Sequence, residues 1–365
     1  MQNDSNKGQS NFIDVQNTKQ KDESIRPKEP GDSKRKRKIP LLIVFLIDIV
    51  IAACALLIFT LYYVVLEDDL SQNMVQLPGT VTVQPSPQAS AEPEESSATA
   101  DPTDEAASET PAVDENSWRV KFADKFTDGE VVKTDNAYKS ANISITIDTV
   151  SKDDVTYYVA DIYVADMKYF KTAFANEEFK AGIGSTAEIG DKHNAILAIN
   201  GDFCSKNKGV VVRNGVLYRD KEYKSDLLVM YNDGSMQTFS PSDFDLEAIK
   251  QNGAYQVWTF GPTLLENGQP MEEFNSSVQT RNPRTAIGYY EPGHYCFVVV
   301  DGRQPGYSKG YEMKELSQLM SSLGCSVAYN LDGGKSSEMV FDGTLYSHPF
   351  EGGRETCDII LIADE

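Results

Sequence analysis

The sequence predicts an α+β fold, in which a sheet-dominated mixed α/β domain lies outside the cytoplasm behind one N-terminal transmembrane helix and a disordered linker. Three observations support this prediction. A long apolar segment lies near the N-terminus, an acidic segment rich in Pro, Ser and Ala follows it, and the rest of the chain alternates short apolar runs with turn residues. With 365 residues, 40% of them hydrophobic, the chain can form a sizeable core.

The apolar segment covers residues 39–66 and contains a single charged side chain, Asp48. Its 28 residues exceed the roughly 20 that a helix needs to cross a bilayer. Residues 1–38 form a basic tail with 10 basic and 6 acidic side chains, whereas an acidic cluster begins at Glu67. Basic residues favour the cytoplasmic side, so we predict a single-pass cell-membrane protein whose N-terminus is cytoplasmic. Because no small-residue cleavage site follows, the segment is predicted to be an uncleaved signal anchor.

Residues 67–117 carry 12 acidic side chains and no basic one, and they are rich in Pro, Ser, Ala and Thr. Such a segment cannot bury enough apolar surface to offset the loss of chain entropy, so we predict a disordered tether. Residues 118–365 carry 36 acidic and 24 basic side chains, a net charge of -12. This acidity argues against nucleic acid as a partner.

Beyond Trp118 the pattern predicts a sheet with two helices, Ser242–Gln251 and Glu312–Leu323. Residues 118–190 form the N-terminal part of the exported domain, and residues 191–365 form the rest. Asn214-Gly215 and Asp233-Gly234 are hairpin turns by residue type. The predicted strands are Ile143–Val150, Thr156–Val164, Ala195–Ile199, Val210–Tyr218, Asp226–Tyr231, Tyr255–Phe260, Thr285–Tyr290, Tyr295–Val300, Ser326–Asn330 and Asp358–Ile362.

Four cysteines lie beyond the predicted membrane segment: Cys204, Cys296, Cys325 and Cys357. Outside the cytoplasm they can form disulfides, for which three pairings exist, or they can stay as buried thiols in the apolar runs that surround them. The absence of a C-x-x-C motif and the presence of only three histidines argue against a zinc site.

Four short polar motifs stand at the ends of predicted strands, where a rigid sheet can present side chains to a ligand. They are Asn200-Gly-Asp-Phe203, Arg281-Asn-Pro-Arg-Thr-Ala286, Asp301-Gly-Arg303 and Asn330-Leu-Asp-Gly-Gly-Lys-Ser-Ser337. Each Asn-Gly or Asp-Gly pair alone is an ordinary turn. Together, three apolar strands that end in Asn or Asp followed by Gly, with arginines on neighbouring segments, indicate carboxylates beside an anion-binding pocket.

In order and spacing, these segments resemble the phosphodiester glycosidase family over about Ala195 to Ile362. The matching elements are N-G-x-F, P-R-T-A-I-G, V-D-G-R and N-L-D-G-G-x-S-S, together with Ser308-Lys-Gly310 leading into a helix. The resemblance implies a glycosidase-like catalytic domain at 191–365. It implies a hydrolase that cleaves a sugar-1-phosphodiester, of the N-acetylglucosamine-1-phosphate type, in a surface or envelope glycan. The products would be a free sugar and a phosphomonoester.

The chemistry of this reaction indicates roles for the polar side chains. Cleavage of an anomeric bond passes through an oxocarbenium-like transition state that a carboxylate stabilises as nucleophile or base. The candidate catalytic residues are Asp301, Asp332 and Asp202, the last at a position where the family often has Gly. Arginines bind phosphate oxygens bidentately. The candidate substrate-binding residues are Arg284, Arg303, Arg354, Asn200, Asn330, Ser308, Ser336 and Ser337.

Two other functions fit parts of the sequence. An envelope protein that binds an anionic glycopolymer without cleaving it would use the same arginines. A serine hydrolase would use Ser308 in a G-x-S-x-G motif, followed by Asp332 and His348, although Pro305 breaks the strand that a nucleophile elbow requires. No cofactor is expected to be required, and Ca²⁺ among Asp202, Asp301 and Asp332 is the metal site that the carboxylates would allow. The expected partners are a phosphorylated glycan and, through one helix, the membrane.

Overall fold

The computed structural model describes residues 53–54, 75–76, 117–206 and 208–365. No helix within these ranges is long and apolar enough to cross a bilayer. The predicted basic tail and, apart from residues 53–54, the predicted transmembrane segment 39–66 lie outside the described residues. In the predicted linker, residues 75–76 form strand β1 (Val75–Gln76), which pairs antiparallel with Val216 and Leu217.

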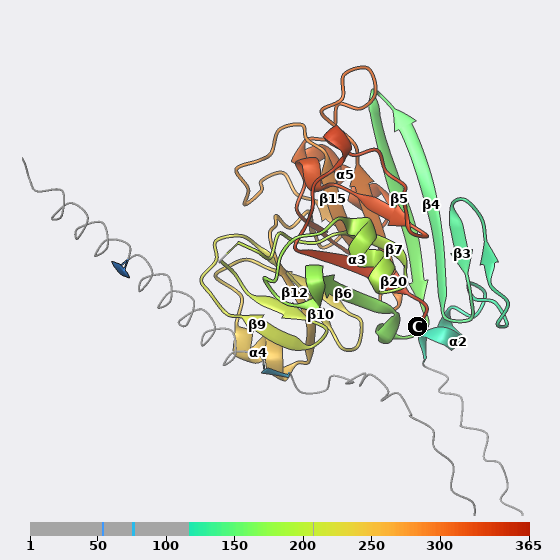
Figure 1. Ribbon diagram of the computed structural model, residues 1–365, viewed down its shortest axis with the longest axis horizontal. Coiled ribbons are helices and arrows are strands. Elements are labelled where there is room, and N and C mark those ends of the chain that lie inside the picture. Colours follow the sequence, from blue (N-terminus) through green and yellow to red (C-terminus); the bar gives the residue numbers. More distant parts are fainter. Residues whose placement is uncertain (1–52, 55–74, 77–116, 207) are drawn as a thin grey trace, which may run out of the picture. The chain divides into compact units, whose positions relative to one another are not determined.

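Three large antiparallel sheets and one two-stranded sheet dominate the described part of the chain, in agreement with the predicted sheet-dominated fold (Figure 1). The seven-stranded sheet has the order β17-β15-β16-β5-β4-β3-β2. Its strands are β2 (Val132–Lys133), β3 (Ala137–Lys139), β4 (Ile143–Lys152), β5 (Val155–Val164), β15 (Arg284–Glu291), β16 (His294–Val300) and β17 (Val327–Asn330).

The other two sheets have the orders β1-β9-β8-β12-β10-β11 and β19-β18-β7-β20-β6. The six-stranded sheet adds β8 (Val211–Arg213), β9 (Val216–Arg219), β10 (Leu227–Tyr231), β11 (Met236–Phe239) and β12 (Ala254–Thr259) to β1. The five-stranded sheet contains β6 (Phe170–Phe174), β7 (Ala195–Asn200), β18 (Met339–Phe341), β19 (Thr344–Leu345) and β20 (Asp358–Ala363). A separate hairpin joins β13 (Leu265–Glu266) to β14 (Gln269–Pro270).

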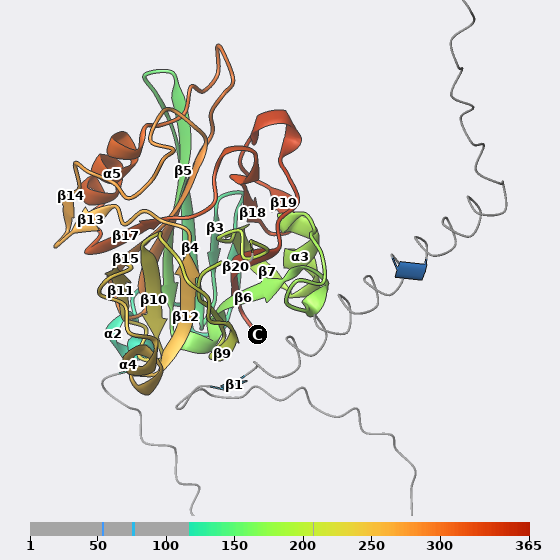
Figure 2. The same ribbon diagram turned by 90° about the vertical axis from the view of Figure 1, so that its left-hand side faces the viewer.

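The three sheets share one hydrophobic core, to which the seven-stranded sheet gives Phe297, the five-stranded sheet Ile199 and the six-stranded sheet Trp258. A helix packs on the other face of each sheet, and the three helices lie apart from one another in both views (Figures 1 and 2). The helices are α3 (Thr186–Lys192), α4 (Leu246–Gln251) and α5 (Met313–Ser322); a single turn, α2 (Trp118–Lys121), precedes them.

All ten predicted strands coincide with strands of the structure. The predicted run Val210–Tyr218 folds as two strands, β8 and β9, because Asn214-Gly215 forms the hairpin turn with φ of 49° and 76°. The predicted helix at Ser242 begins four residues later, since the Asp245 carboxylate accepts hydrogen bonds from the amides of Glu247 and Ala248 and caps the helix there. Helix α3 was not predicted, because its seven residues carry no clear apolar stripe.

Residues 118–190 contribute strands to the seven-stranded and the five-stranded sheets. Strand β5 pairs with β16 from Tyr157–Val300 to Tyr163–His294, and β6 pairs with β20 from Phe170–Ile362 to Phe174–Asp358. The same segment provides Ile143, Ile145, Ile162 and Phe170 to the shared core.

A fragment that begins at residue 191 should therefore fail to fold. Removing β5 and β6 exposes the edges of β16 and β20, and exposed apolar edges pair with other chains. We expect fragment 191–365 to aggregate, whereas fragment 117–365 elutes as a monomer and unfolds cooperatively. Size-exclusion chromatography and thermal circular dichroism measure both properties. A monomeric fragment 191–365 with a cooperative transition would contradict this account of the core.

Candidate functional site

A cavity of about 1480 Å³ is lined by loops that follow β7, β9, β12, β16 and β17. The segments after these strands come from all three sheets, and they place Asp202, Lys221, Gly261, Arg303 and Asp332 on its wall. Four of these strands, β7, β9, β12 and β16, have a neighbouring strand on each side, and β17 is an edge strand paired with β15, so the polar side chains start from a rigid scaffold.

The four polar motifs found in the sequence meet at this cavity. The Nδ2 of Asn200 donates to the carbonyl oxygen of Asp332 at 2.8 Å, and the amide of Gly334 donates to the carbonyl oxygen of Pro283 at 2.9 Å. A Cβ on Gly302 would lie 2.7 Å from the Pro283 nitrogen, so only glycine lets these two segments approach so closely. The structure thus brings together segments separated by as many as 137 positions in the sequence, from 200 to 337.

The cavity wall is cationic although the domain is acidic. Nine basic and three acidic side chains line it, whereas acidic residues outnumber basic ones in the domain. The excess of positive charge is therefore gathered at one place, where low-dielectric walls strengthen its attraction for an anion. The basic residues are Lys206, Lys208, Arg219, Lys221, Lys224, Arg284, Arg303, Lys335 and Arg354.

Arg284 is buried, with 4% of its surface exposed, and its guanidinium donates only to backbone carbonyl oxygens. These are the carbonyls of Tyr311 at 3.1 Å, Val278 at 3.1 Å and Thr280 at 2.6 Å. Burial, and to a lesser extent the charge of Arg303, lower the pKa of Arg284 to about 10. This buried cation therefore has hydrogen-bond partners but contacts no carboxylate in the part of the chain that the structure describes.

Arg303 also contacts no carboxylate among the described residues. Its Nε and Nη2 donate to Oδ1 of Asn282 at 3.0 and 2.7 Å, and its guanidinium lies 5.7 Å from the ring centre of Phe350. Its backbone φ of 60° is uncommon for a residue other than glycine and is a conformation that functional sites often hold. Two arginines that contact no carboxylate among the described residues lie in one cavity, an arrangement that can bind an anion such as a phosphoryl group.

Asp332 is the cavity carboxylate whose partner is itself on the cavity wall. Its Oδ2 accepts from Nη2 of Arg354 at 2.8 Å, and its Oδ1 accepts from the amide of Gly333 at 2.9 Å. Burial raises the pKa of Asp332, while the Ser336 hydroxyl and the Arg354 charge oppose the rise. Ser336 also accepts from Nε of Arg354 at 2.9 Å, so it holds this arginine against Asp332.

Asp301 is not among the residues that line the cavity, where Asp332 lies, so the catalytic role expected for Asp301 stays a prediction. Its carboxylate is buried and accepts from the hydroxyls of Tyr158 and Tyr307 at 2.9 and 2.8 Å and from the amide of His348 at 3.2 Å. Burial raises the pKa of Asp301, and these three hydrogen bonds oppose the rise. The side chain therefore fixes the loop that carries Arg303.

Asp202 lines the cavity and contacts other residues of the protein, and its catalytic role stays a prediction. Its Oδ1 lies 2.8 Å from Nη2 of Arg213, and its Oδ2 accepts from the Thr259 amide at 2.7 Å. Arg213 also contacts Oδ2 of Asp358 at 2.8 Å, which makes a buried triad of two carboxylates and one guanidinium. Because breaking a buried ion pair leaves an uncompensated charge, this triad holds the cavity wall in place.

The predicted amide and hydroxyl ligands divide into two groups. Asn200, Ser308, Ser336 and Ser337 are buried and do not line the cavity. Asn330 lines it, and its Oδ1 is a buried acceptor with no partner among the described residues, as a site for a sugar hydroxyl requires.

Ser308 is not placed to act as a nucleophile. Its hydroxyl donates to the carbonyl of Asp301 at 2.6 Å and accepts from the amide of Thr156 at 3.0 Å, and the residue has no exposed surface. The serine hydrolase that the G-x-S-x-G motif indicated therefore has no accessible nucleophile here.

Sequence reasoning missed the wall formed by the segment after β7. Lys206 lies 4.7 Å from the ring centre of Phe203 and 5.8 Å from that of Phe260, and Arg354 lies 5.6 Å from that of Phe203. Arg219 donates to the carbonyls of Cys204, Lys206 and Gly209 and so holds this segment. The excess of Lys and Arg between 206 and 224 in an otherwise acidic domain was the signal available in the sequence.

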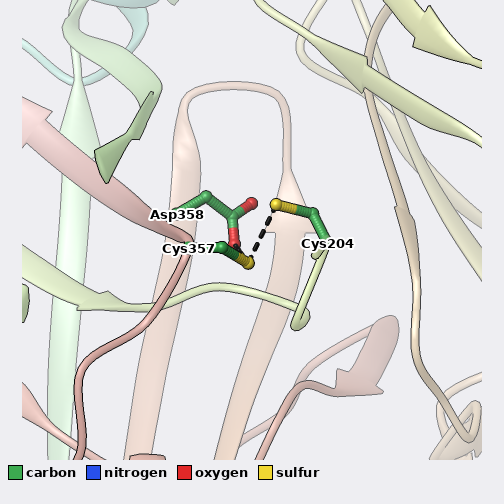
Figure 3. Close-up of side chains that lie close together, drawn as sticks. All are labelled: Cys204, Cys357 and Asp358. Atoms are coloured by element: carbon green, nitrogen blue, oxygen red, sulfur yellow. Dashed lines mark hydrogen bonds between the residues drawn. The ribbon is translucent and has the colours of Figure 1, made fainter. Parts of the chain in front are cut away.

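The three carboxylates suggested for Ca²⁺ do not form a group of ligands in the described part of the chain. Two of them face arginines, Asp202 at Arg213 and Asp332 at Arg354, and Asp301 faces tyrosine hydroxyls. The group of side chains close enough to share a metal ion is a different one, Cys204, Cys357 and Asp358 (Figure 3).

Residues 193–363 match the family model for phosphodiester glycosidases. The chain is 27% identical over 183 residues to the SPbeta prophage-derived uncharacterized protein YomE of Bacillus subtilis (strain 168), covering 47% of this chain and 28% of that protein. It is 30% identical over 99 residues to the N-acetylglucosamine-1-phosphodiester alpha-N-acetylglucosaminidase of Bos taurus, covering 27% and 18%.

The chain therefore spans less than a third of the length of these two curated relatives. Among solved structures, it is similar to the catalytic domain of the zebrafish N-acetylglucosamine-1-phosphodiester alpha-N-acetylglucosaminidase in its pro-peptide-inhibited form. The TM-score is 0.51 at 18% identity, with 66% of this chain and 86% of that chain covered. At this identity the likeness shows a shared fold.

Inorganic phosphate should stabilise the folded chain through Arg284 and Arg303. A ligand at about 100 times its Kd raises the free energy of unfolding by about 2.7 kcal/mol. We expect Arg303→Gln to lose most of this gain, because it removes one of the two unbalanced charges. Arg281→Gln is the matched control, since Arg281 forms an ion pair with Glu315 and does not line the cavity.

Thermal unfolding with and without phosphate, at constant ionic strength, measures the gain for each variant. An equal gain in wild type, Arg303→Gln and Arg281→Gln would contradict the assignment of the anion site.

Proposed function

We propose, from the match of residues 193–363 to the family model for phosphodiester glycosidases, that the chain hydrolyses a glycosyl phosphodiester, of the N-acetylglucosamine-1-phosphate type, in a surface or envelope glycan. The products are a free sugar and a phosphomonoester. The observation that carries this proposal is the pair Arg284 and Arg303, two guanidiniums without an acidic partner in the cavity that also holds Asp332.

The side chains of the cavity can divide the work of the reaction. The arginines bind the phosphoryl oxygens and balance the charge that grows on the leaving phosphate as the anomeric C–O bond breaks. The electron pair of that bond goes to the phosphate oxygen, so the leaving group needs less protonation than a sugar alcohol would. Asp332 stabilises the positive charge at the anomeric carbon, as nucleophile or as base toward water. Water supplies the new hydroxyl, and its remaining proton is released.

The size and lining of the cavity favour a polymeric substrate. Its volume of about 1480 Å³ exceeds the roughly 300–1,000 Å³ of pockets for drug-sized ligands. Phe203 and Phe260 give apolar faces on which a sugar ring can pack, and Asn330 gives an acceptor for a hydroxyl. We place this activity outside the cytoplasm, where the predicted signal anchor would hold the domain at the membrane surface and within reach of envelope glycans.

Incubation of the full-length chain, purified in mild detergent, with sugar-1-phosphodiesters of several sugars tests the proposal. Proton NMR detects free reducing sugar, and the anomer that forms first gives the stereochemistry. Binding of these compounds without release of sugar would support the glycopolymer-binding alternative instead and overturn the hydrolase.

Asp332→Asn should separate catalysis from binding. We expect the rate of sugar release to fall by about 10³-fold, because the neutral amide cannot stabilise a developing positive charge. The stabilisation by phosphate should persist, since Arg284 and Arg303 are intact. Arg303→Gln should lower the rate by about 10²-fold and weaken phosphate binding as well. A rate for Asp332→Asn near that of wild type would exclude Asp332 from the chemistry.

The acid limit of activity should follow the protonation of Asp332. The working form is the carboxylate, so activity is lost as pH falls through its pKa, which burial raises above the usual 3.8. Since Arg354 opposes this rise, Arg354→Gln should raise the pKa of Asp332 further and move the acid limb of kcat/KM to higher pH. Arg354→Lys keeps the charge and should shift it less. An acid limb at the same pH in all three proteins would contradict the role of Asp332.

A further inference from the structure

Two buried cysteines lie close in sequence to residues that line the cavity. Cys204 follows Phe203, and Cys357 comes three positions after Arg354. The Sγ atoms of Cys204 and Cys357 are 2.9 Å apart, and Figure 3 shows the two side chains pointing at each other with the Asp358 carboxylate alongside. Both residues are buried, at 2% and 3% exposure. A backbone hydrogen bond connects the two segments that carry them, since the amide of Gly201 donates to the carbonyl of Asp358 at 2.9 Å.

We propose that Cys204 and Cys357 form a disulfide in the exported chain, and that this bond fixes the cavity wall that carries Phe203 and Lys206. The two residues follow β7 and precede β20, which are neighbouring paired strands. The fold already holds these two segments side by side. A bond between the sulfurs therefore needs little backbone movement, which is the condition for a disulfide without strain.

The bond forms by thiol–disulfide exchange with a disulfide-bearing oxidant of the extracytoplasmic space. One cysteine attacks the oxidant's disulfide and releases one of its thiols. The second cysteine then displaces the other thiol from the mixed disulfide. Two protein thiols and one oxidant disulfide thus become one protein disulfide and two oxidant thiols. Hydrogen bonding to Cys357 and burial raise the pKa of Cys204 well above its usual value, so little thiolate exists once the loop has docked. The exchange therefore takes place during folding.

A metal ion shared with Asp358 fits this geometry less well. Two thiolates on one tetrahedral zinc lie about 3.7 Å apart, because each Zn–S bond is about 2.3 Å long. The sulfurs here are closer, at 2.9 Å. The Oδ2 of Asp358 is also held by Nε and Nη2 of Arg213 at 3.0 and 2.8 Å, and a guanidinium at this place repels a cation.

The disulfide links two segments that support different parts of the cavity wall. Phe203 immediately precedes Cys204, whose carbonyl accepts from Nη1 of Arg219 at 2.7 Å. Asp358 immediately follows Cys357 and pairs with Arg213, which also pairs with Asp202 on the cavity wall. Opening the disulfide frees both ends to move apart, and the cationic wall loses part of its order.

Disulfide mapping of the full-length chain tests the proposal directly. The chain is purified in mild detergent from a host that exports it, unfolded without reductant in the presence of N-ethylmaleimide, and digested with trypsin. The expected product is peptide 193–206 linked to peptide 355–365, which separates on reduction. Recovery of both peptides as maleimide adducts overturns the proposal. So does a link from either peptide to the peptides that contain Cys296 or Cys325.

Metal analysis of the same preparation decides the alternative. One equivalent of zinc, with both thiols reactive only after chelation, would replace the disulfide by a metal site and overturn the proposal. The mapping uses the wild-type chain and so does not depend on whether a variant folds.

The effect on the cavity is measured with Cys204→Ser/Cys357→Ser. We expect the melting temperature to fall by about 5–15 °C and the Kd for inorganic phosphate to rise several-fold. The matched control is Cys296→Ala/Cys325→Ala, a buried pair whose sulfurs are 3.5 Å apart in the core beneath α5 and which is not part of the cavity lining. Its phosphate Kd should equal that of wild type. Unchanged phosphate affinity and melting temperature in the Ser/Ser variant would refute the role of the bond in the wall.

Discussion

The presence of two guanidiniums without a balancing carboxylate is the constraint on which the rest of the site depends. Arg284 is buried among carbonyl oxygens, and the charge of Arg303 beside it lowers its pKa further. A folded domain tolerates such a pair when the surrounding structure holds it and when an anion completes it. The acidity of the rest of the domain makes this local excess of positive charge more specific, because polyanions are not attracted to its surface as a whole.

The fold holds this arrangement by using backbone contacts and buried charge. Strand ends from three sheets converge, and the loops that follow them are tied to one another through Asn200, Pro283 and Gly334. Beneath them, Arg213 joins two carboxylates from different segments, so that the cavity floor cannot move without separating buried charges. Strands from residues 118–190 complete the sheets, and the site therefore depends on a part of the chain that contributes no residue to the cavity lining.

The sequence was sufficient to predict the longer strands and the convergence of polar motifs at their ends, because period-two patterns and Asn-Gly or Asp-Gly pairs are local signals, but it missed shorter strands such as β6 and β18. It was not sufficient to predict where a carboxylate points. Asp301 and Asp332 follow similar strands. However, the hydroxyl of Tyr158, 143 positions away in the sequence, donates to the carboxylate of Asp301, which does not line the cavity. A contact over this sequence distance leaves no local pattern by which it could be predicted. The pairing of four cysteines was likewise undetermined from the sequence, since three pairings fit it equally well.

The most direct test of the account is a crystal structure of the chain soaked with a non-hydrolysable analogue of a sugar-1-phosphodiester, such as a phosphonate. We expect the phosphonate oxygens to lie within hydrogen-bond distance of the Arg284 and Arg303 guanidiniums, with the anomeric carbon facing Asp332. Density for the phosphonate at the lysines of the segment after β7 instead, with Arg284 and Arg303 contacting only protein and water, would contradict it.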